Sequence, residues 1–223
     1  MLARRRATVH EGLAWLGRPP EARAGPGYRF LVAVAGFVCR RVFRLRIEIE
    51  RSGRLPEGGY LVIAAAHRGW IDPFLVLFAL PVAPRPWFLG SGPSTLTSPL
   101  REAFIRRVGG LLPVWRGGLG IEQHVESARA VLAAGGILVQ MPEGTVNGPL
   151  GRIAAFRHGA SLIALRTLAP IVPIAMAGTE DLYLGRRLAV RVLPPTSAPE
   201  LLGSAWPGTA PPPGSRAELE LAR

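Results

Sequence analysis

Short apolar runs that alternate with helical patterns constrain the fold of this chain more than any other feature. Residues 60–66 are apolar throughout, as in a strand buried on both faces, whereas residues 45–50 alternate apolar and polar side chains. Residues 121–134 form an amphipathic helical pattern that is closed by two glycines. The remaining segments follow the same alternation: strands are expected at 86–89, 111–114, 137–141, 171–177 and 188–193, and helices at 73–80, 99–108 and 159–167. This order predicts an α/β fold with a mostly parallel central sheet flanked by helices.

The chain of 223 residues divides into three segments by composition. Residues 45–193 carry the strand–helix alternation, residues 1–44 are basic and partly apolar, and residues 194–223 are rich in proline. We expect the last segment to be a mobile tail with a short terminal helix over 215–222.

The N-terminal segment contains one apolar run, Phe30 to Cys39, which is shorter than the span of about 20 residues that a bilayer requires. An arginine-rich stretch follows it, with Arg40, Arg41, Arg44 and Arg46. An apolar helix with such an end can lie in the interface of an anionic membrane, so we expect a membrane-associating helical segment. A core helix with a solvated end fits the pattern equally well.

The charge of the chain limits its partners. The formal net charge is +12, and all 27 basic residues are arginine. Such a balance suits nucleic acid, an anionic membrane surface or phosphorylated substrates. Nucleic acid is the weakest of the three, because the arginines are scattered and aromatic residues do not interleave with them. The single cysteine, Cys39, excludes an internal disulfide and a cysteine metal cluster.

One histidine and one aspartate stand out at the end of the apolar run 60–66. His67 and Asp72 are five positions apart, and Asp72 is one of only two aspartates in the chain. A carboxylate that fixes the tautomer of an imidazole raises its basicity, so a turn that joins the two would make a general base. The alternative is structural: His67 ends a strand, and Asp72 caps a helix whose first residue is Pro73.

Three further motifs follow expected strands. Arg116, among glycines after residues 111–114, could hold a phosphate bidentately, or could be an ordinary surface arginine. Glu143, Gly144 and Thr145 follow residues 137–141 in a turn whose backbone N–H groups can face an anion. Pro173 lies inside the expected strand 171–177, where we favour a purely structural role.

Together these stretches resemble the 1-acyl-sn-glycerol-3-phosphate acyltransferases, a family of glycerolipid acyltransferases with four sequence blocks. The order and spacing fit over about residues 45 to 180. The matching stretches are 67–72, 113–116, 142–145 and 172–175, with a further similarity at 156–160.

The resemblance implies an enzyme that needs no metal and no cofactor. His67 would be the general base on the sn-2 hydroxyl of lysophosphatidic acid, and Asp72 would orient it. Acyl-CoA or acyl-carrier protein would donate the acyl group, giving phosphatidic acid. Arg116 would hold the acceptor phosphate, and Glu143-Gly144-Thr145 would shape the acceptor pocket. We expect such an enzyme at the cytoplasmic face of the cell membrane, peripheral or monotopic, with the anionic lipid surface as a partner and no nucleic acid.

The chain departs from the family pattern at two places. Val146 stands where the third block usually continues with arginine, and the lysine that the family tends to carry near residues 89–91 is absent. Valine cannot bind a phosphate, so Arg116, Arg152 or Arg157 compensates, or the acceptor is a different lysolipid. A catalytically weak, membrane-binding homologue is the other alternative.

Overall fold

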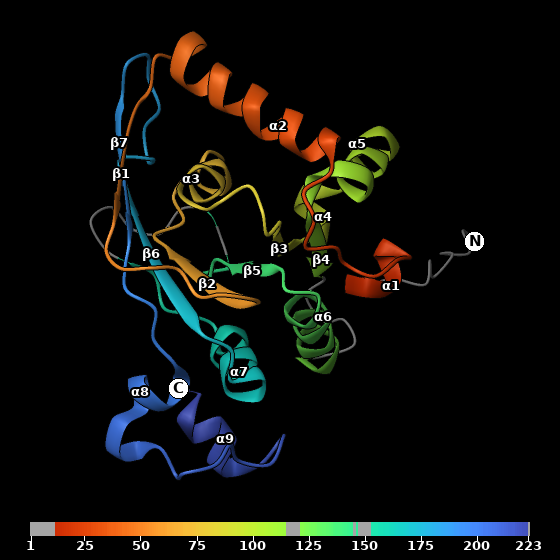
Figure 1. Cartoon of the computed structure of the whole chain (residues 1–223), viewed down its shortest axis with the longest axis vertical. Coiled ribbons are helices and arrows are strands. Elements are labelled where there is room, and N and C mark those ends of the chain that lie inside the picture. Colours follow the sequence, from red (N-terminus) through yellow and green to blue (C-terminus); the bar gives the residue numbers. More distant parts are fainter. Residues whose placement is uncertain (1–11, 115–120, 145, 147–152, 223) are drawn as a thin grey trace, which may run out of the picture.

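The computed structural model describes residues 12–114, 121–144, 146 and 153–222. Within these residues, strands form one seven-stranded sheet in the order β1-β7-β6-β2-β5-β3-β4 (Figure 1). The bounds are β1 Arg46–Arg51, β2 Tyr60–Ala65, β3 Pro86–Ser91, β4 Leu111–Val114, β5 Ile137–Gln140, β6 Ile171–Ala177 and β7 Arg187–Val192. Every neighbouring pair is parallel except β6 with β7. The predicted mostly parallel α/β fold is therefore confirmed.

Helices lie on both faces of this sheet (Figure 1). Their bounds are α1 Gly12–Leu16, α2 Pro26–Phe37, α3 Asp72–Ala79, α4 Gly92–Thr95, α5 Pro99–Phe104, α6 Ile121–Ala133, α7 His158–Thr167, α8 Ala198–Leu202 and α9 Arg216–Leu221. Two π-helical turns, η1 Val38–Val42 and η2 Ile105–Gly109, extend α2 and α5, and a 3₁₀ turn, η3 Gly203–Ala205, follows α8. The predicted helix 99–108 is thus an α-helix that continues as a π-helix.

The core consists of two layers that the central strand β2 separates. Tyr60 and Val62 of β2 pack on the side of α3, in one cluster with Leu75. Leu61 faces the opposite side, in a cluster with Val125 of α6 and Ile163 of α7. This arrangement explains why residues 60–66 are apolar without alternation: each successive side chain enters one of two buried layers.

The N-terminal apolar run lies within the continuous helix formed by α2 and η1. The Tyr28 ring of α2 stacks on the guanidinium of Arg85, with 4.8 Å between Cζ and the ring centroid, and this attaches the helix to the start of β3. Burial raises the pKa of Tyr28 to about 12. Of the helices that the structure describes, none is both long enough and apolar enough to cross a bilayer. Membrane association of this segment stays a prediction, as does the division of the chain into three segments.

The C-terminal segment packs against the body of the protein, contrary to the expected mobile tail. Glu218 of α9 is fully buried, and its carboxylate lies 2.6 Å from Nε of Arg166 on α7. Ala222 joins Leu162 and Leu165 of α7 in a third hydrophobic cluster. Proline content alone did not reveal this contact, because it depends on a charge pair between residues far apart in the sequence. The short terminal helix itself is present, as α9.

The sheet topology sets the place of the site. β2 and β5 are parallel neighbours, so their carboxyl ends lie at the same edge of the sheet. His67 comes two residues after the end of β2, and Glu143 three residues after the end of β5. Two of the four sequence blocks therefore meet above adjacent strands.

Candidate active site

His67 and Asp72 form a direct hydrogen-bonded pair. Nδ1 of His67 lies 2.8 Å from Oδ2 of Asp72. The carboxylate is completely buried, whereas the His67 side chain keeps 15% of its surface exposed. Because an ionised carboxylate can only accept, Nδ1 carries the proton of this bond and Nε2 is left as the basic nitrogen. The pair has the geometry of a general base with its orienting carboxylate.

The loop between the two residues is held by the same carboxylate oxygen. Oδ2 of Asp72 also accepts hydrogen bonds from the backbone N–H groups of Arg68, at 2.6 Å, and of Gly69, at 2.9 Å. Asp72 is the first residue of α3, one position earlier than expected, where a negative charge is favoured by the helix dipole. A Cβ on Gly69 would lie 2.6 Å from the carbonyl oxygen of Thr179, so only glycine fits there. The sequence spacing thus encodes a compact, preorganised turn.

Glu143 ties this turn to the loop that follows β5. The side chain is 3% exposed, and its Oε1 accepts a hydrogen bond of 2.7 Å from the backbone N–H of His67. Oε2 accepts from the backbone N–H of Ala154 at 3.2 Å. Both carboxylate oxygens therefore have backbone partners, and a substrate contact by Glu143 stays a prediction.

Gly144 leaves room for the Arg157 side chain beside residues 142–145. A Cβ on Gly144, whose φ is +66°, would lie 2.5 Å from Nε of Arg157. Nε of Arg157 donates to the carbonyl of Glu143 at 3.4 Å, and its backbone N–H donates to the carbonyl of Pro142 at 2.8 Å. Arg116, Arg152 and Arg157 are the arginines predicted to compensate for Val146, and of these Arg157 alone lies in the described residues. It is exposed and adjoins this loop.

Some predicted site residues lie outside the described part of the chain. These are Arg116, Thr145 and Arg152. β4, which precedes Arg116, ends at Val114 and is three strands away from β2 in the sheet, or ~14 Å at the usual strand spacing. Val146 is described and is 41% exposed.

An aromatic cluster flanks the turn formed by residues 67–72 and was not predicted. Trp70, inside the turn, makes edge-to-face contacts with Phe43 and Phe74, with ring centroids 6.4 and 6.2 Å apart. Trp70 is 59% exposed although it is large and apolar. A tryptophan between the histidine and the aspartate is the sequence signal for this cluster, but its partner Phe43 is too distant in the chain to be paired with it by spacing.

The acidic side chains at the site do not form a metal-binding group. In the described residues, no group of three or more His, Cys, Asp or Glu side chains is positioned to hold a metal ion. His67 pairs with Asp72 through its ring, whereas Glu143 contacts the backbone N–H of His67 and not its ring. The hydrogen-bonded pair of His67 and Asp72 is suited to moving a proton.

Comparisons with known proteins identify the family of this chain. The family model described as "Acyltransferase" matches residues 46–177, which include all four sequence blocks. The 1-acyl-sn-glycerol-3-phosphate acyltransferase alpha of Mus musculus is 28% identical over 186 residues, covering 77% of this chain and 62% of that protein. The protein of the same name from Ovis aries is 29% identical over 167 residues, covering 69% of this chain and 55% of that protein. The chain thus spans little more than half the length of these curated relatives.

A solved structure is similar in fold. The 1-acyl-sn-glycerophosphate (LPA) acyltransferase, PlsC, from Thermotoga maritima gives a TM-score of 0.58 at 19% sequence identity. The alignment covers 76% of this chain and 70% of that chain. At this identity the likeness supports the fold, whereas the family resemblance inferred from the four blocks is confirmed by the family match.

Proposed function

The chain belongs to the acyltransferase family, and on that premise we propose that it acylates the sn-2 hydroxyl of lysophosphatidic acid, giving phosphatidic acid. The donor is a thioester, acyl-CoA or acyl-carrier protein, and no further cofactor takes part. The hydrogen bond of 2.8 Å between His67 and the buried Asp72 carries this proposal. The mammalian relatives are 1-acyl-sn-glycerol-3-phosphate acyltransferases, which supports the choice of acceptor.

The reaction begins with proton transfer to His67. Nε2 removes the proton of the acceptor hydroxyl while the oxygen attacks the carbonyl carbon of the thioester. Asp72 stabilises the imidazolium that forms, and the N–H groups of Arg68 and Gly69 hold the carboxylate in place. The tetrahedral oxyanion then collapses, the carbon–sulfur bond breaks, and the departing thiolate takes the proton from His67. Free thiol and the new ester are released, and His67 returns to its neutral form.

Glu143 acts on this reaction as a positioning residue. Its carboxylate bonds to the backbone of His67 and of Ala154, so it fixes the imidazole relative to the loop after β5. Gly144 and Thr145 shape the acceptor pocket, and backbone N–H groups of this loop stabilise the oxyanion. Such a donor contributes about 10²–10³-fold in rate when it is aimed at the developing charge.

Two arginines hold the acceptor phosphate. Arg116 takes this role by its place in the second block. Arg157 takes over from the arginine that Val146 replaces, and its packing against Gly144 supports this assignment. A planar guanidinium can bind a phosphate with two hydrogen bonds, which a lysine cannot do.

The enzyme works as a peripheral or monotopic protein at the cytoplasmic face of the membrane. Phe30, Val34 and Phe37 are exposed along one side of α2, at the spacing of one helical face. The arginines after this face, together with the net charge of +12, suit an anionic lipid surface.

The test is thiol release from palmitoyl-CoA and from palmitoyl-acyl-carrier protein with a panel of lysophospholipids. Turnover with lysophosphatidic acid should fall by at least ~10²–10⁴-fold in His67→Ala, because the general base is lost. His124→Ala on α6 is the matched control, which should keep turnover per folded molecule. Equal turnover of wild type and His67→Ala would exclude the mechanism.

A different lysolipid acceptor is the second candidate, favoured by one observation. Val146 is 41% exposed where a phosphate-binding arginine is usual. If turnover depends on His67 but requires a lysolipid other than lysophosphatidic acid, the chemistry stands and the acceptor changes. If the folded, liposome-bound protein acts on neither donor with any acceptor, it is a catalytically weak membrane-binding homologue.

A further inference from the structure

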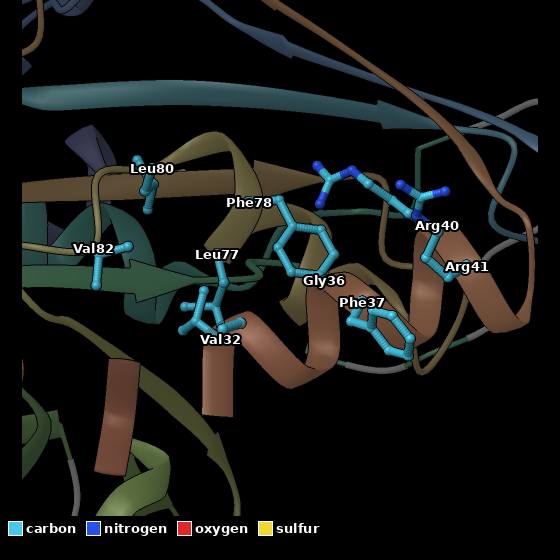
Figure 2. A pocket seen from close by; sticks show the side chains of 10 residues that line it. Val32, Gly36, Phe37, Arg40, Arg41, Leu77, Phe78, Leu80 and Val82 are labelled. Carbon is cyan, nitrogen blue, oxygen red and sulfur yellow. The ribbon is translucent and has the colours of Figure 1, made fainter. Parts of the chain in front are cut away.

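A shallow groove separates the N-terminal helix from α3 (Figure 2). Its volume is about 390 Å³, within the range of about 300–1,000 Å³ that is typical of small-molecule sites. Its lining comes from α2 with η1 on one side, and from α3 and the residues after it on the other. The lining residues are Val32, Ala33, Gly36, Phe37, Arg40, Arg41, Leu77, Phe78, Leu80 and Val82.

The groove is basic at one end and apolar over the rest of its length. Figure 2 shows the guanidinium groups of Arg40 and Arg41 together at one end, and Leu80 and Val82 toward the other. Cζ of Arg40 lies 5.0 Å from the centroid of the Phe78 ring, which marks the boundary between the two parts. A ligand that fits both parts has an anionic head and a hydrocarbon chain.

Gly36 determines the depth of the groove. It is buried in the wall formed by α2, and a Cβ at this position would lie 3.2 Å from Nη1 of Arg40 and 3.7 Å from Cε1 of Phe78. Because Gly36 has no side chain, Arg40 can lie across the helix onto the Phe78 ring. A large side chain at this position would occupy the groove.

The groove adjoins the exposed apolar face of α2. Phe37 both lines the groove and is 62% exposed, and it continues the row formed by Phe30 and Val34. An occupant with a hydrocarbon chain would therefore enter from the surface that exposes these side chains. A lipid surface is the source of such chains.

The groove is distinct from the candidate active site. On the side of α3, the groove is lined by residues of the second half of that helix and by residues after it, whereas Asp72 is the first residue of α3. Phe78 is six residues after Asp72, or ~9 Å along the helix axis. None of the ten lining residues belongs to the turn 67–72 or to the loop around Glu143.

We infer that this groove binds one acyl chain of an anionic phospholipid of the bilayer, with the lipid phosphate on Arg40 and Arg41. The lipid is not consumed there, since the groove contains no His67 and no Asp72. Binding in the groove would add a specific contact with one lipid molecule to the general attraction of a basic protein for an anionic surface.

Binding to the full chain can be measured by calorimetry with dodecyl phosphate below its micelle-forming concentration. Dodecyl maltoside and inorganic phosphate serve as probes that lack the anionic head or the chain. We expect Arg40→Gln/Arg41→Gln to weaken dodecyl phosphate binding at least about tenfold, because two charge-assisted contacts are lost. Arg54→Gln/Arg216→Gln removes the same charge at exposed positions and should change the affinity by less than about twofold. Equal binding of dodecyl maltoside and dodecyl phosphate would overturn the inference.

Two variants test the shape of the groove independently of its charge. Gly36→Leu fills the groove from its wall, and Val32→Phe narrows it from a partly exposed position that is less prone to disturb folding. Both should weaken dodecyl phosphate binding by about tenfold or more, since the displaced chain loses its apolar contacts. Ala133→Leu adds comparable bulk at an exposed position of α6 and should leave binding unchanged. Unaltered binding in both groove variants, as folded proteins, would contradict the inference.

Kinetics separate this lipid site from the acceptor site. With lysophosphatidic acid in neutral detergent and no anionic phospholipid, the KM of Gly36→Leu and of Val32→Phe should equal that of the wild type. A rise in KM that parallels the loss of dodecyl phosphate binding would assign the groove to the acceptor and overturn a separate site. His67→Ala should bind dodecyl phosphate like the wild type, so a failure of the proposed catalysis leaves this test intact.

Discussion

Two fully buried carboxylates, Asp72 at the candidate active site and Glu218 in the C-terminal segment, have similar surroundings and different partners. Each accepts hydrogen bonds from a basic side chain and from the backbone. Asp72 pairs with His67 and with the N–H groups of Arg68 and Gly69. Glu218 pairs with Arg166 through both carboxylate oxygens, at 2.6 and 2.8 Å, and accepts from the N–H of Gly214 at 2.7 Å.

The partners determine what each pair can do. Imidazole exchanges protons near neutral pH, and the His67 side chain retains some exposure, so that pair can move a proton. The guanidinium of Arg166 stays protonated, and the hydrogen bonds of Glu218 raise its pKa further, so this pair can only hold α9 on α7. In the proposed mechanism, the same arrangement of carboxylate, base and backbone amides is reactive around Asp72 and structural around Glu218.

Asp72→Asn should have the largest effect of these substitutions, and the effect should be on turnover. The amide cannot stabilise an imidazolium and favours the wrong tautomer of His67, so we expect kcat to fall by ~10³–10⁴-fold. Thermal unfolding should change far less than turnover. Asp181→Asn, the only other aspartate and an exposed one, is the control and should behave as wild type. A loss of kcat of less than about tenfold would mean that Asp72 is structural.

Glu218→Gln should lower the stability of the fold without lowering turnover. Removing the charge of Glu218 leaves Arg166 paired only with the more exposed Glu122. The cost should therefore lie below the about 3–5 kcal/mol expected when one partner of a fully buried pair is removed. We expect a lower urea midpoint, or early release of the C-terminal segment detected by limited proteolysis. The kcat should stay near the wild-type value at temperatures where the protein is folded. Glu220→Gln, in a solvent-exposed pair with Arg216, is the control and should change stability by less than about 1 kcal/mol.

The difference between the two regions also explains what sequence could predict. His67 and Asp72 are five residues apart in one block, so their spacing predicted that a turn could join them, and the order of strand and helix patterns predicted the mostly parallel sheet. Arg166 and Glu218 are 52 residues apart, and Phe43 and Trp70 come from different segments. Such pairs depend on how helices dock, which periodicity does not encode. Glu143 lies in the loop after β5, as its block predicted, but its hydrogen bonds with the backbone of His67 and Ala154 depend on tertiary structure.

Glu143 is a third buried carboxylate, and its two oxygens accept hydrogen bonds from the backbone N–H groups of His67 and Ala154. Glu143→Gln keeps the shape but presents an NH₂ group to one of the two backbone N–H donors. An unsatisfied buried donor costs about 1–3 kcal/mol, so we expect kcat to fall about tenfold. In the proposed mechanism Glu143 positions His67 and exchanges no proton, so the pH profile of kcat should keep its form. Glu57→Gln, exposed on a turn, is the control. A changed profile would mean that Glu143 takes part in proton transfer.

The smallest expected effect is the acid dependence of the structural pair. The hydrogen bond and charge of Arg166 lower the pKa of Glu218 despite its burial, below the value of about 4.3 for an unfolded chain. Its contribution to stability is therefore complete above the unfolded pKa and is lost as the pH falls through the lowered folded value. Thermal unfolding of wild type and Glu218→Gln, measured from pH 6 down to about pH 3, should show the difference in Tm narrow as the acid limit is approached. Other carboxylates titrate in both proteins and cancel in that difference. A constant difference over this range would mean that the ionised form of Glu218 does not stabilise the fold, and the C-terminal segment would then be held by its hydrophobic contacts with Leu162 and Leu165 alone.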